Sequence, residues 1–210
     1  MADSRQRILI LGASGFSLEV AEVVEQLPGF RVAGFVQSLW PERRGETIEG
    51  YPVYYIDELP GLVADHRAVT GTGSPQRAAF VEQVERTGMR FATIVHPLAT
   101  VSPRSKLGEG CVLLAGTVVG ARAALGRHVI LNRNSSVGHD TQLAEHVFLG
   151  PGATVAGSCR LGAGCFVGAG AVIRDHLTVG ENCFVGAGAA VLNNAPPRVI
   201  VSAPRSSILE

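Results

Sequence analysis

The sequence has no net charge and few aromatic residues. Lys and Arg together number 18, Asp and Glu also number 18, and aromatic residues make up 6% of the 210 residues. A neutral chain is a poor partner for a polyanion, and surfaces that stack nucleic-acid bases need aromatic side chains. We therefore expect no nucleic-acid partner.

Long apolar runs are also missing. No stretch approaches the roughly 18 apolar residues of a membrane helix. The apolar run before Gly12 is four residues long, too short for the core of a signal peptide. We expect a cytoplasmic protein with no membrane partner. Lys106 is the only lysine, which argues against lysine chemistry as the basis of an activity.

Glycine, by contrast, is abundant, and a six-residue repeat accounts for much of it. Counting from Val95 in steps of six, 17 successive residues are Val, Leu or Ile, with no insertion or deletion. We call this residue position 1 of each hexad. Position 2 is Gly in nine of the 17 hexads, and position 5 is almost always small.

This period predicts a parallel β-helix. It fits no α-helix, whose period is 3.6 residues. A short strand and a turn fit well if position 1 points inward, glycine supplies the turn and position 5 fills a tight corner. Three such strands form a triangular coil of 18 residues, and coils stack about 4.8 Å apart. We predict the β-helix over residues 95–196 and a C-terminal tail over residues 197–210.

The four cysteines have a simple interpretation in this repeat. Cys111, Cys159, Cys165 and Cys183 all occupy position 5. There they replace Ala or Ser as small inward side chains, and we expect neither a disulfide nor a metal site.

Residues 1–94 predict a separate α/β domain of Rossmann type. Its strands and helices follow one another in a β-α-β order, and Ser74 caps the second helix with Pro75 as its first residue. We expect strands over residues 7–11, 31–36 and 67–71, helices over residues 16–27 and 75–87, and a surface loop over residues 40–50.

The Gly-Ala-Ser-Gly turn of residues 12–15 opens the first helix. Its amides and the helix dipole suit a phosphate or a carboxylate. Ser14 and Ser17 stand where the dinucleotide fingerprint needs glycine, so the turn is either a ligand site of another kind or a simple connection. Residues 71–73, at the end of another strand, would form the far wall of the same crevice.

His139 is the candidate catalytic residue. It occupies position 3, with Gly157 one coil above it and Ala121 one coil below, so its ring would lie in a notch with room for a ligand. Asp140 would orient the ring, and the Gly157 amide would face the reacting group. The alternative is a solvent-exposed turn histidine.

His128 and His146 are 18 residues apart and should stack at one corner. With a third ligand such a pair would suit a zinc site between chains. Two exposed turn histidines are the interpretation we favour.

Taken together, these features resemble a known family. The hexad repeat, the Gly-Ala-Ser-Gly turn, the Ile-Val-His-Pro junction of residues 94–97 and the pattern Asn132-x3-Ser136-x2-His139-Asp140 are similar to the bacterial sugar O- and N-acyltransferases of the sialic-acid, bacillosamine and perosamine type. The resemblance implies a left-handed β-helix, a homotrimer, acetyl-CoA as co-substrate, no metal, and N-acetylation of a nucleotide-linked amino sugar.

The resemblance also implies roles for individual residues. His139 would be the general base, Asp140 its acidic partner and Gly157 the donor to the oxyanion. Asn132 would lie near the site. Ser14, Gly15 and Gly71 would contact the nucleotide sugar, and Ala169 and Ala187 would line the CoA groove between two β-helices. Both alanines occupy position 3, as His139 does, which suggests one shared groove geometry.

Three residues depart from the family pattern. Phe148 replaces a histidine that contacts acetyl-CoA, Phe16 replaces the histidine after the glycine-rich turn, and Gln37 lies where the family has paired aspartates near the base. We predict an acetyl-CoA-dependent N-acetyltransferase acting on a nucleotide-diphospho amino sugar. The alternatives are an O-acetyltransferase, a γ-type carbonic anhydrase with zinc held by His128, His139 and His146, and a nucleotide-sugar sensor with a dead site.

Overall fold

The computed structural model describes residues 4–203, so the end of the predicted tail, residues 204–210, lies outside the described part. The chain divides into two compact units: Met1–Pro97 with Glu109–Leu114, and Leu98–Gly108 with Ala115–Glu210. Within residues 4–203, no helix is both long and apolar enough to cross a membrane.

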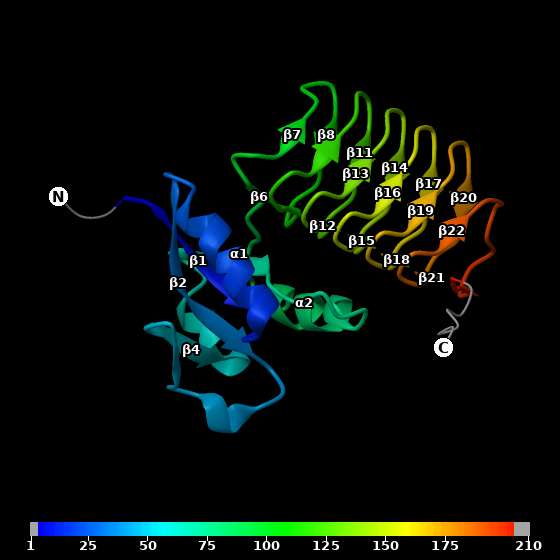
Figure 1. Cartoon of the computed structure of the whole chain (residues 1–210). Coiled ribbons are helices and arrows are strands. Elements are labelled where there is room, and N and C mark those ends of the chain that lie inside the picture. The colour runs from blue at the N-terminus through cyan, green and yellow to red at the C-terminus, as the bar shows by residue number, and fades with distance from the viewer. Residues whose placement is uncertain (1–3, 204–210) are drawn as a thin grey trace, which may run out of the picture. The chain divides into compact units, whose positions relative to one another are not determined.

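The first unit contains a five-stranded sheet in the order β3-β4-β2-β1-β5 (Figure 1). Only the β3–β4 pair is antiparallel. The apolar residues of β1 are fully buried, as expected of a central parallel strand. The elements are β1 (Gln6–Leu11), α1 (Gly15–Glu25), β2 (Phe30–Gln37), the 3-10 helix η1 (Pro41–Arg43), β3 (Thr47–Ile48), β4 (Tyr51–Tyr55), the 3-10 helix η2 (Ile56–Gly61), β5 (His66–Thr70) and α2 (Arg77–Glu85).

The predicted strands and first helix of this unit are confirmed, and two other expectations are wrong. Helix α2 begins at Arg77 rather than Pro75, because the Ser74 hydroxyl accepts a hydrogen bond from the Gln76 amide (3.2 Å) and holds a turn before the helix. The expected loop over residues 40–50 contains η1 and β3, and β3 pairs with β4. Strand β4 escaped prediction because Pro52 interrupts a run of five residues.

The strand order creates a switch point between β1 and β5. From β1 the chain builds outward through β2 to β4, and then returns past β1 to place β5 on its other side. Ligands of open α/β sheets bind outside the carboxyl ends of the strands at such a point. The turn of residues 12–15 follows β1 and residues 71–74 follow β5, so both loops lie at this edge.

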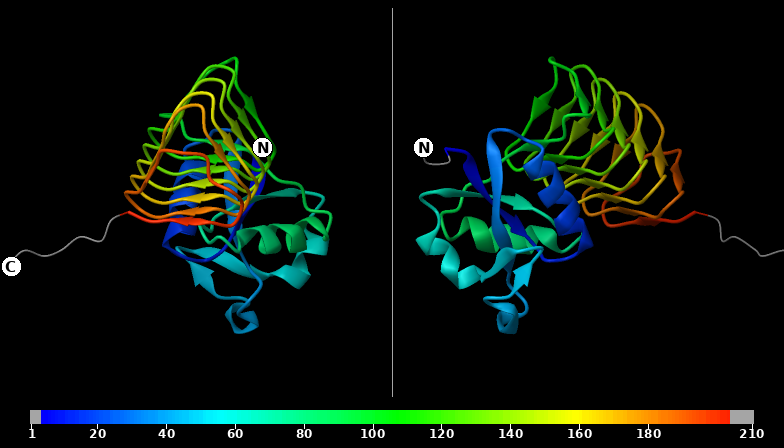
Figure 2. Two further views of the ribbon diagram at one scale, coloured as in Figure 1. Left: turned by 90° about the vertical axis from the view of Figure 1, so that its right-hand side faces the viewer. Right: turned by 60° about the vertical axis from the view of Figure 1, so that its left-hand side comes forward.

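The second unit is a parallel β-helix, seen nearly along its axis in the left view of Figure 2. Strands that pair are 18 residues apart through most of its length, as in Val119↔Val137↔Val155. We name its three faces after a central strand. The β13 sheet has the order β22-β19-β16-β13-β10-β7, the β14 sheet β20-β17-β14-β11-β8, and the β15 sheet runs β23-β21-β18-β15-β12 within this unit.

Every strand of the β-helix is two residues long. The β13 sheet contains β7 (Thr100–Val101), β10 (Val118–Val119), β13 (Ser136–Val137), β16 (Thr154–Val155), β19 (Val172–Ile173) and β22 (Ala190–Val191). The β14 sheet contains β8 (Lys106–Leu107), β11 (Ala124–Leu125), β14 (Gln142–Leu143), β17 (Arg160–Leu161) and β20 (Thr178–Val179). The β15 sheet contains β12 (Ile130–Leu131), β15 (Phe148–Leu149), β18 (Phe166–Val167), β21 (Phe184–Val185) and β23 (Ile200–Val201). The first unit has a two-residue parallel pair of its own, β6 (Ile94–Val95) and β9 (Val112–Leu113).

The predicted interior is confirmed. Every position 1 residue from Leu113 to Val191 is buried, while Val95, Val101 and Leu107 are half-buried. The four cysteines are buried at position 5 with free thiols, as expected. Burial raises the pKa of the Cys165 thiol to about 11, so this side chain behaves as a small apolar residue.

The predicted role of glycine in the turn is wrong. The glycines at position 2 do not adopt a left-handed conformation; instead they allow the coils to approach closely. A Cβ on Gly138 would lie 2.5 Å from the backbone nitrogen of Gly157 in the next coil. The left-handed residue of the turn is at position 4, where φ is 59° at Arg122 and 60° at Asp140.

Candidate active site

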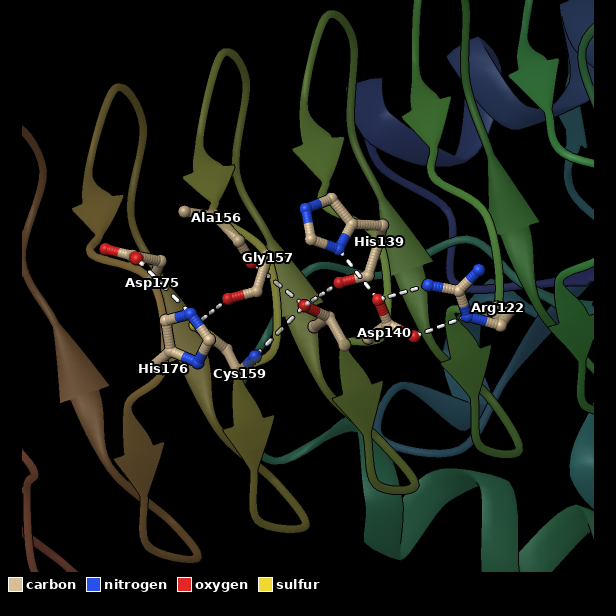
Figure 3. A network of polar contacts seen from close by, with 9 residues as sticks. Arg122, His139, Asp140, Ala156, Gly157, Cys159, Asp175 and His176 are labelled. Atoms are coloured by element: carbon tan, nitrogen blue, oxygen red, sulfur yellow. Dashed lines mark hydrogen bonds and ion pairs between the residues drawn. The ribbon is translucent and has the colours of Figure 1, made fainter.

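One corner of the β-helix contains all three predicted catalytic residues, His139, Asp140 and Gly157. It follows the strands of the β13 sheet, and positions 3 and 4 of successive coils stack there (Figure 3). We call it the His139 corner. From coil to coil it contains Ala121 and Arg122, His139 and Asp140, Gly157 and Ser158, and Asp175 and His176.

The imidazole of His139 is held by its neighbour. Its Nδ1 lies 2.8 Å from Oδ2 of Asp140. Two hydrogen-bonding partners, Arg122 first and His139 second, lower the pKa of Asp140 to about 2, so this carboxylate is ionised and accepts only. Nδ1 is therefore the donor in this hydrogen bond, and in the neutral ring Nε2 holds the lone pair. This is the tautomer that a general base needs.

Arg122 is a member of this site that sequence reasoning missed. Its Nε lies 2.6 Å from Oδ1 of Asp140 and its Nη2 lies 2.7 Å from Oδ2. The two residues are 18 apart and share the left-handed conformation of position 4, so their side chains run alongside one another. The spacing of 18 in the sequence was the signal that would have found this pair.

Gly157 lies beside the imidazole, as predicted. A Cβ added to Gly157 would be 2.8 Å from both Cε1 and Nε2 of His139. Gly157 is also the only glycine at position 3 in the 17 hexads. Within residues 4–203, its amide N–H donates no hydrogen bond. The corner therefore presents a nitrogen lone pair and a free amide donor close together.

Buried hydrogen bonds fix the backbone around Gly157. The hydroxyl of Thr141 donates to the carbonyl of Ala156 (2.9 Å) and accepts from the amide of Cys159 (3.1 Å). The Gly157 carbonyl accepts the amide of His176 (3.0 Å). The peptide that carries the free amide is thus held from both sides, which pre-organises it.

Four other predicted residues lie on a different corner of the same chain. Asn132, Ala169 and Ala187 follow strands of the β15 sheet, and Phe148 lies in β15 itself. The two alanines are exposed, whereas Asn132 is buried and its Oδ1 accepts the amide of Arg133 (2.7 Å). We call this the Asn132 corner. Position 3 recurs at all three corners, so Ala169 and Ala187 lie at a different corner from His139 within one chain, and the predicted groove between two β-helices stays a prediction.

Phe148 begins an aromatic stack on the outside of the β15 sheet. Its ring lies 4.8 Å from that of Phe166, which lies 4.9 Å from that of Phe184. Phe148 is buried, and Phe184 is exposed.

The histidine pair also departs from expectation. His128 and His146 stack as predicted, with ring centroids 5.1 Å apart, but His128 is buried rather than exposed. They follow strands of the β14 sheet, so one chain does not bring them to His139. Among residues 4–203, no group of three His, Cys, Asp or Glu side chains could hold a metal ion.

In the first unit, the two predicted walls of the crevice meet at Ser17. Its hydroxyl donates to the Gly71 carbonyl (2.8 Å) and accepts the Ser14 amide (3.1 Å). Apart from its chain neighbours and the backbone of α1, no atom lies within 4 Å of a Cβ added to Gly15, so there is open space beside the start of α1. A ligand there would meet the positive end of the helix dipole.

A cavity of about 240 Å³ lies beside this crevice and is lined in part by Ser38, Thr72 and Arg77. Arg77 is buried, and desolvation lowers the pKa of its guanidinium to about 10, so the group stays charged at neutral pH. Gln37 is buried at the end of β2, and Phe16 is half-buried in the first turn of α1. Arg77 was not among the predicted residues, because a buried charge is not visible in an isolated helical sequence.

The chain is similar to known hexapeptide-repeat transferases. A family model described as bacterial transferase hexapeptide (six repeats) matches residues 158–193. A structure of perosamine N-acetyltransferase from Caulobacter crescentus, a histidine-to-asparagine variant in complex with CoA and GDP-perosamine, is 30% identical and covers 93% of each chain, with a TM-score of 0.85. The chain belongs to the bacterial sugar acyltransferase family. Its β-helix is left-handed, and the predicted family and fold class are confirmed.

Two further structures resemble this acyltransferase. The acetyltransferase domain of PglB from Neisseria gonorrhoeae, in complex with acetyl coenzyme A, is 29% identical over 95% of this chain and 97% of that chain (TM-score 0.86). WeeI from Acinetobacter baumannii AYE is 27% identical over 93% and 96% of the two chains (TM-score 0.85). A search of curated proteins gave no match.

Proposed function

We propose that this acyltransferase moves the acetyl group of acetyl-CoA to the amino group of a nucleotide-diphospho sugar. The observation that carries the proposal is the pair of His139 and Asp140, whose hydrogen bond leaves Nε2 of the imidazole free beside Gly157. The perosamine N-acetyltransferase in complex with CoA and GDP-perosamine supports this class of donor and acceptor.

The chemical step uses three groups of the His139 corner. The sugar amine attacks the thioester carbonyl carbon, and Nε2 of His139 takes a proton from the amine. The amide of Gly157 donates to the oxyanion of the tetrahedral intermediate. The C–S bond then breaks, CoA leaves as a thiolate, and the imidazolium returns the proton to the sulfur. Asp140 keeps its charge throughout and stabilises the imidazolium.

The first unit would bind the nucleotide part of the acceptor. The turn that contains Ser14 and Gly15, together with the backbone of Gly71, surrounds open space at the amino end of α1, where a diphosphate is favoured. The cavity lined by Ser38 and Arg77 would take the adjoining part of the nucleotide. Gln37, whose side chain is buried, and Phe16 would shape this site from behind.

The donor site would form between chains. Ala169 and Ala187 lie at the Asn132 corner, away from the base in the same chain. We infer a homotrimer in which the Asn132 corner of one chain faces the His139 corner of the next, with acetyl-CoA lying between them. Phe148 and Asn132 would then flank the donor groove from the partner's side.

Release of CoA thiol, measured against UDP-, GDP- and dTDP-amino sugars and the matching hydroxy sugars, tests the activity. We expect release with an amino sugar, and a loss of at least about 10²-fold in His139→Asn, the scale of losing a general base. Release with hydroxy sugars alone would replace the proposal by O-acetylation. Near-normal turnover of His139→Asn would remove His139 as the base. Binding of a nucleotide sugar and CoA without turnover would favour a sensor.

Mixing two inactive variants tests the site between chains. His139→Asn lacks the base, and Ala169→Trp fills the exposed donor position. Trimers assembled from equal amounts of both contain some interfaces with two intact corners, and we expect about one quarter of the wild-type activity. If base and donor position served the same site within one chain, mixing would restore nothing.

A further inference from the structure

The guanidinium of Arg122 has no part in the chemical step described above, although it lies close to it. It does not touch His139; it binds the carboxylate that holds His139. Both of its hydrogen bonds to Asp140 are short, 2.6 Å from Nε and 2.7 Å from Nη2, and they reach both carboxylate oxygens. Figure 3 shows the Asp140 carboxylate between the His139 ring and the Arg122 guanidinium.

Asp140 has two effects on the imidazole, one that favours catalysis and one that opposes it. Its hydrogen bond fixes the ring and the tautomer, which catalysis needs. Its negative charge favours the protonated imidazole, which cannot accept a proton from the amine. An efficient site therefore needs the hydrogen bond of Asp140 but also a group that offsets its negative charge.

We propose that Arg122 is the positioning residue of this site: its guanidinium holds the Asp140 carboxylate in place against His139 and offsets the negative charge of that carboxylate. The proposal rests on the function proposed above, because it assigns Arg122 a part in activating that base.

The surroundings of His139 within the β-helix make Arg122 the dominant opposing charge. Position 3 on the adjacent coils is Ala121 and Gly157, and position 4 on the next coil is Ser158, so all three neighbours are uncharged. The next charged groups at this corner are Asp175 and His176, two coils beyond His139. At about 4.8 Å per coil they are roughly a Debye length away and are largely screened.

Arg104 occupies the corresponding position 4 one coil below Arg122, so it lies two coils from Asp140. Its charge is screened by the same distance. Removing Arg122 therefore leaves the Asp140 carboxylate beside the imidazole without the positive charge that is hydrogen-bonded to both of its oxygens.

A purely structural role for Arg122 does not explain this geometry. Its side chain is 64% exposed and that of Asp140 35%, and surface ion pairs of this kind contribute little to stability. The pair instead joins two adjacent coils, and its carboxylate is also hydrogen-bonded to His139. We therefore expect the loss of this pair to change the pH dependence of the reaction and to leave the melting temperature unchanged.

The test compares Arg122→Gln with Arg122→Lys. In the glutamine variant we expect the acid limb of the kcat/KM profile to move to higher pH by about half to one pH unit. The lysine variant keeps the positive charge, so its acid limb should stay with the wild type. Its plateau kcat should still fall several-fold, because Lys cannot make the paired hydrogen bonds of Arg. KM for acetyl-CoA should not change in either variant.

Two controls separate this role from a general loss of charge. Arg198 forms another exposed ion pair of the same β-helix, with its Nη2 2.9 Å from Oε1 of Glu181. Arg198→Gln removes that pair and should leave the pH profile of kcat/KM unchanged. In an Asp140→Asn background, Arg122→Gln should cause a smaller shift, because the carboxylate that holds the Arg122 guanidinium near the imidazole is gone. A shift of equal size in that background, or an unmoved limb in Arg122→Gln at an unchanged melting temperature, would overturn the proposal.

A measurement without substrates distinguishes failure of this proposal from failure of the proposed function. The ring signals of His139, assigned with the His139→Asn variant, can be followed by NMR as the pH changes. We expect their midpoint to move upward in Arg122→Gln and to stay in place in Arg198→Gln. That result in an enzyme that acetylates no amino sugar would keep the role of Arg122 and reject the substrate. An unmoved midpoint would reject the role whatever the activity.

Discussion

Gly157→Ala adds one methyl group at the point where the imidazole needs room. The new Cβ would lie 2.8 Å from Cε1 and Nε2 of His139. Carbon atoms in contact prefer about 3.5 to 4.0 Å. The ring must therefore move by about 1 Å or leave its rotamer, and a 1 Å misplacement of a reacting group can cost about 10²-fold in rate.

The same change should cost almost no stability. Gly157 is not in the left-handed region, and position 3 is already alanine one coil away at Ala121. Replacing glycine by alanine at a compatible position also reduces the entropy of the unfolded chain, a gain of about 0.4 to 1 kcal/mol. The local crowding and this gain oppose one another, so we expect an unchanged melting temperature.

The assay is CoA-thiol release at saturating acetyl-CoA together with thermal unfolding of each variant. We expect kcat to fall about 10²-fold in Gly157→Ala at constant melting temperature. Gly29→Ala is the matched control, because no atom lies within 4 Å of its added Cβ and its φ is not left-handed. Full activity in Gly157→Ala would refute the argument that the imidazole needs this notch.

Three further predictions follow from individual residues. Gly138→Ala should destabilise the β-helix by about 2 kcal/mol in denaturant unfolding, since its Cβ would lie 2.5 Å from the backbone of the next coil; an unchanged midpoint would disprove that account of position 2. Cys165→Ala should keep nearly full activity, and the native thiol should resist a thiol reagent at about pH 8, because burial raises its pKa to about 11; rapid labelling of the folded protein would contradict this. The lowered pKa of Asp140 means that its small stabilising contribution is present above the ordinary value of 3.8 and is lost as pH falls to about 2. The difference in melting temperature between the wild type and Asp140→Asn should therefore shrink as pH falls below about 4, and a difference that grows with acid would reverse the sign.

The β-helix could be read from the sequence because one constraint repeats. Position 1 must be apolar and position 5 small in every coil, so the pattern survives any single exception such as Leu177. The pattern does not reveal the backbone conformation at each position, because glycine is frequent at both position 2 and position 4. At position 2 it allows the coils to approach closely, and at position 4 it suits the left-handed turn. Residues such as Asp140 at position 4 show that the turn accepts other side chains.

The site was predictable only where its members are neighbours in the sequence or one coil apart. His139, Asp140 and Gly157 follow from the spacing of 18. The spacing of 18 also places Arg122 one coil from Asp140. The ion pair between them could not be predicted from spacing alone, because it depends on the orientation that position 4 gives to both side chains. The separation of Ala169 from His139 was missed because position 3 recurs at three corners, and only the count of hexads within a coil tells them apart.

In the α/β unit, local patterns predicted β1, β2, β5 and both α-helices, but they missed β3, β4 and the start of α2. The run of Ile and Leu in β1 is a strong signal, whereas β4 is short and contains Pro52. The start of α2 depends on a hydrogen bond of the Ser74 side chain, which competes with the helix for the same backbone amide.

The most direct test of the account is the structure of the product. The enzyme would be incubated with acetyl-CoA and the nucleotide amino sugar that releases the most CoA thiol, and the product examined by NMR. We expect one new acetyl group bonded to the sugar nitrogen, formed by the wild type and lost in His139→Asn. An acetyl group on a sugar oxygen, or an acetylated amine formed equally well without His139, would contradict it.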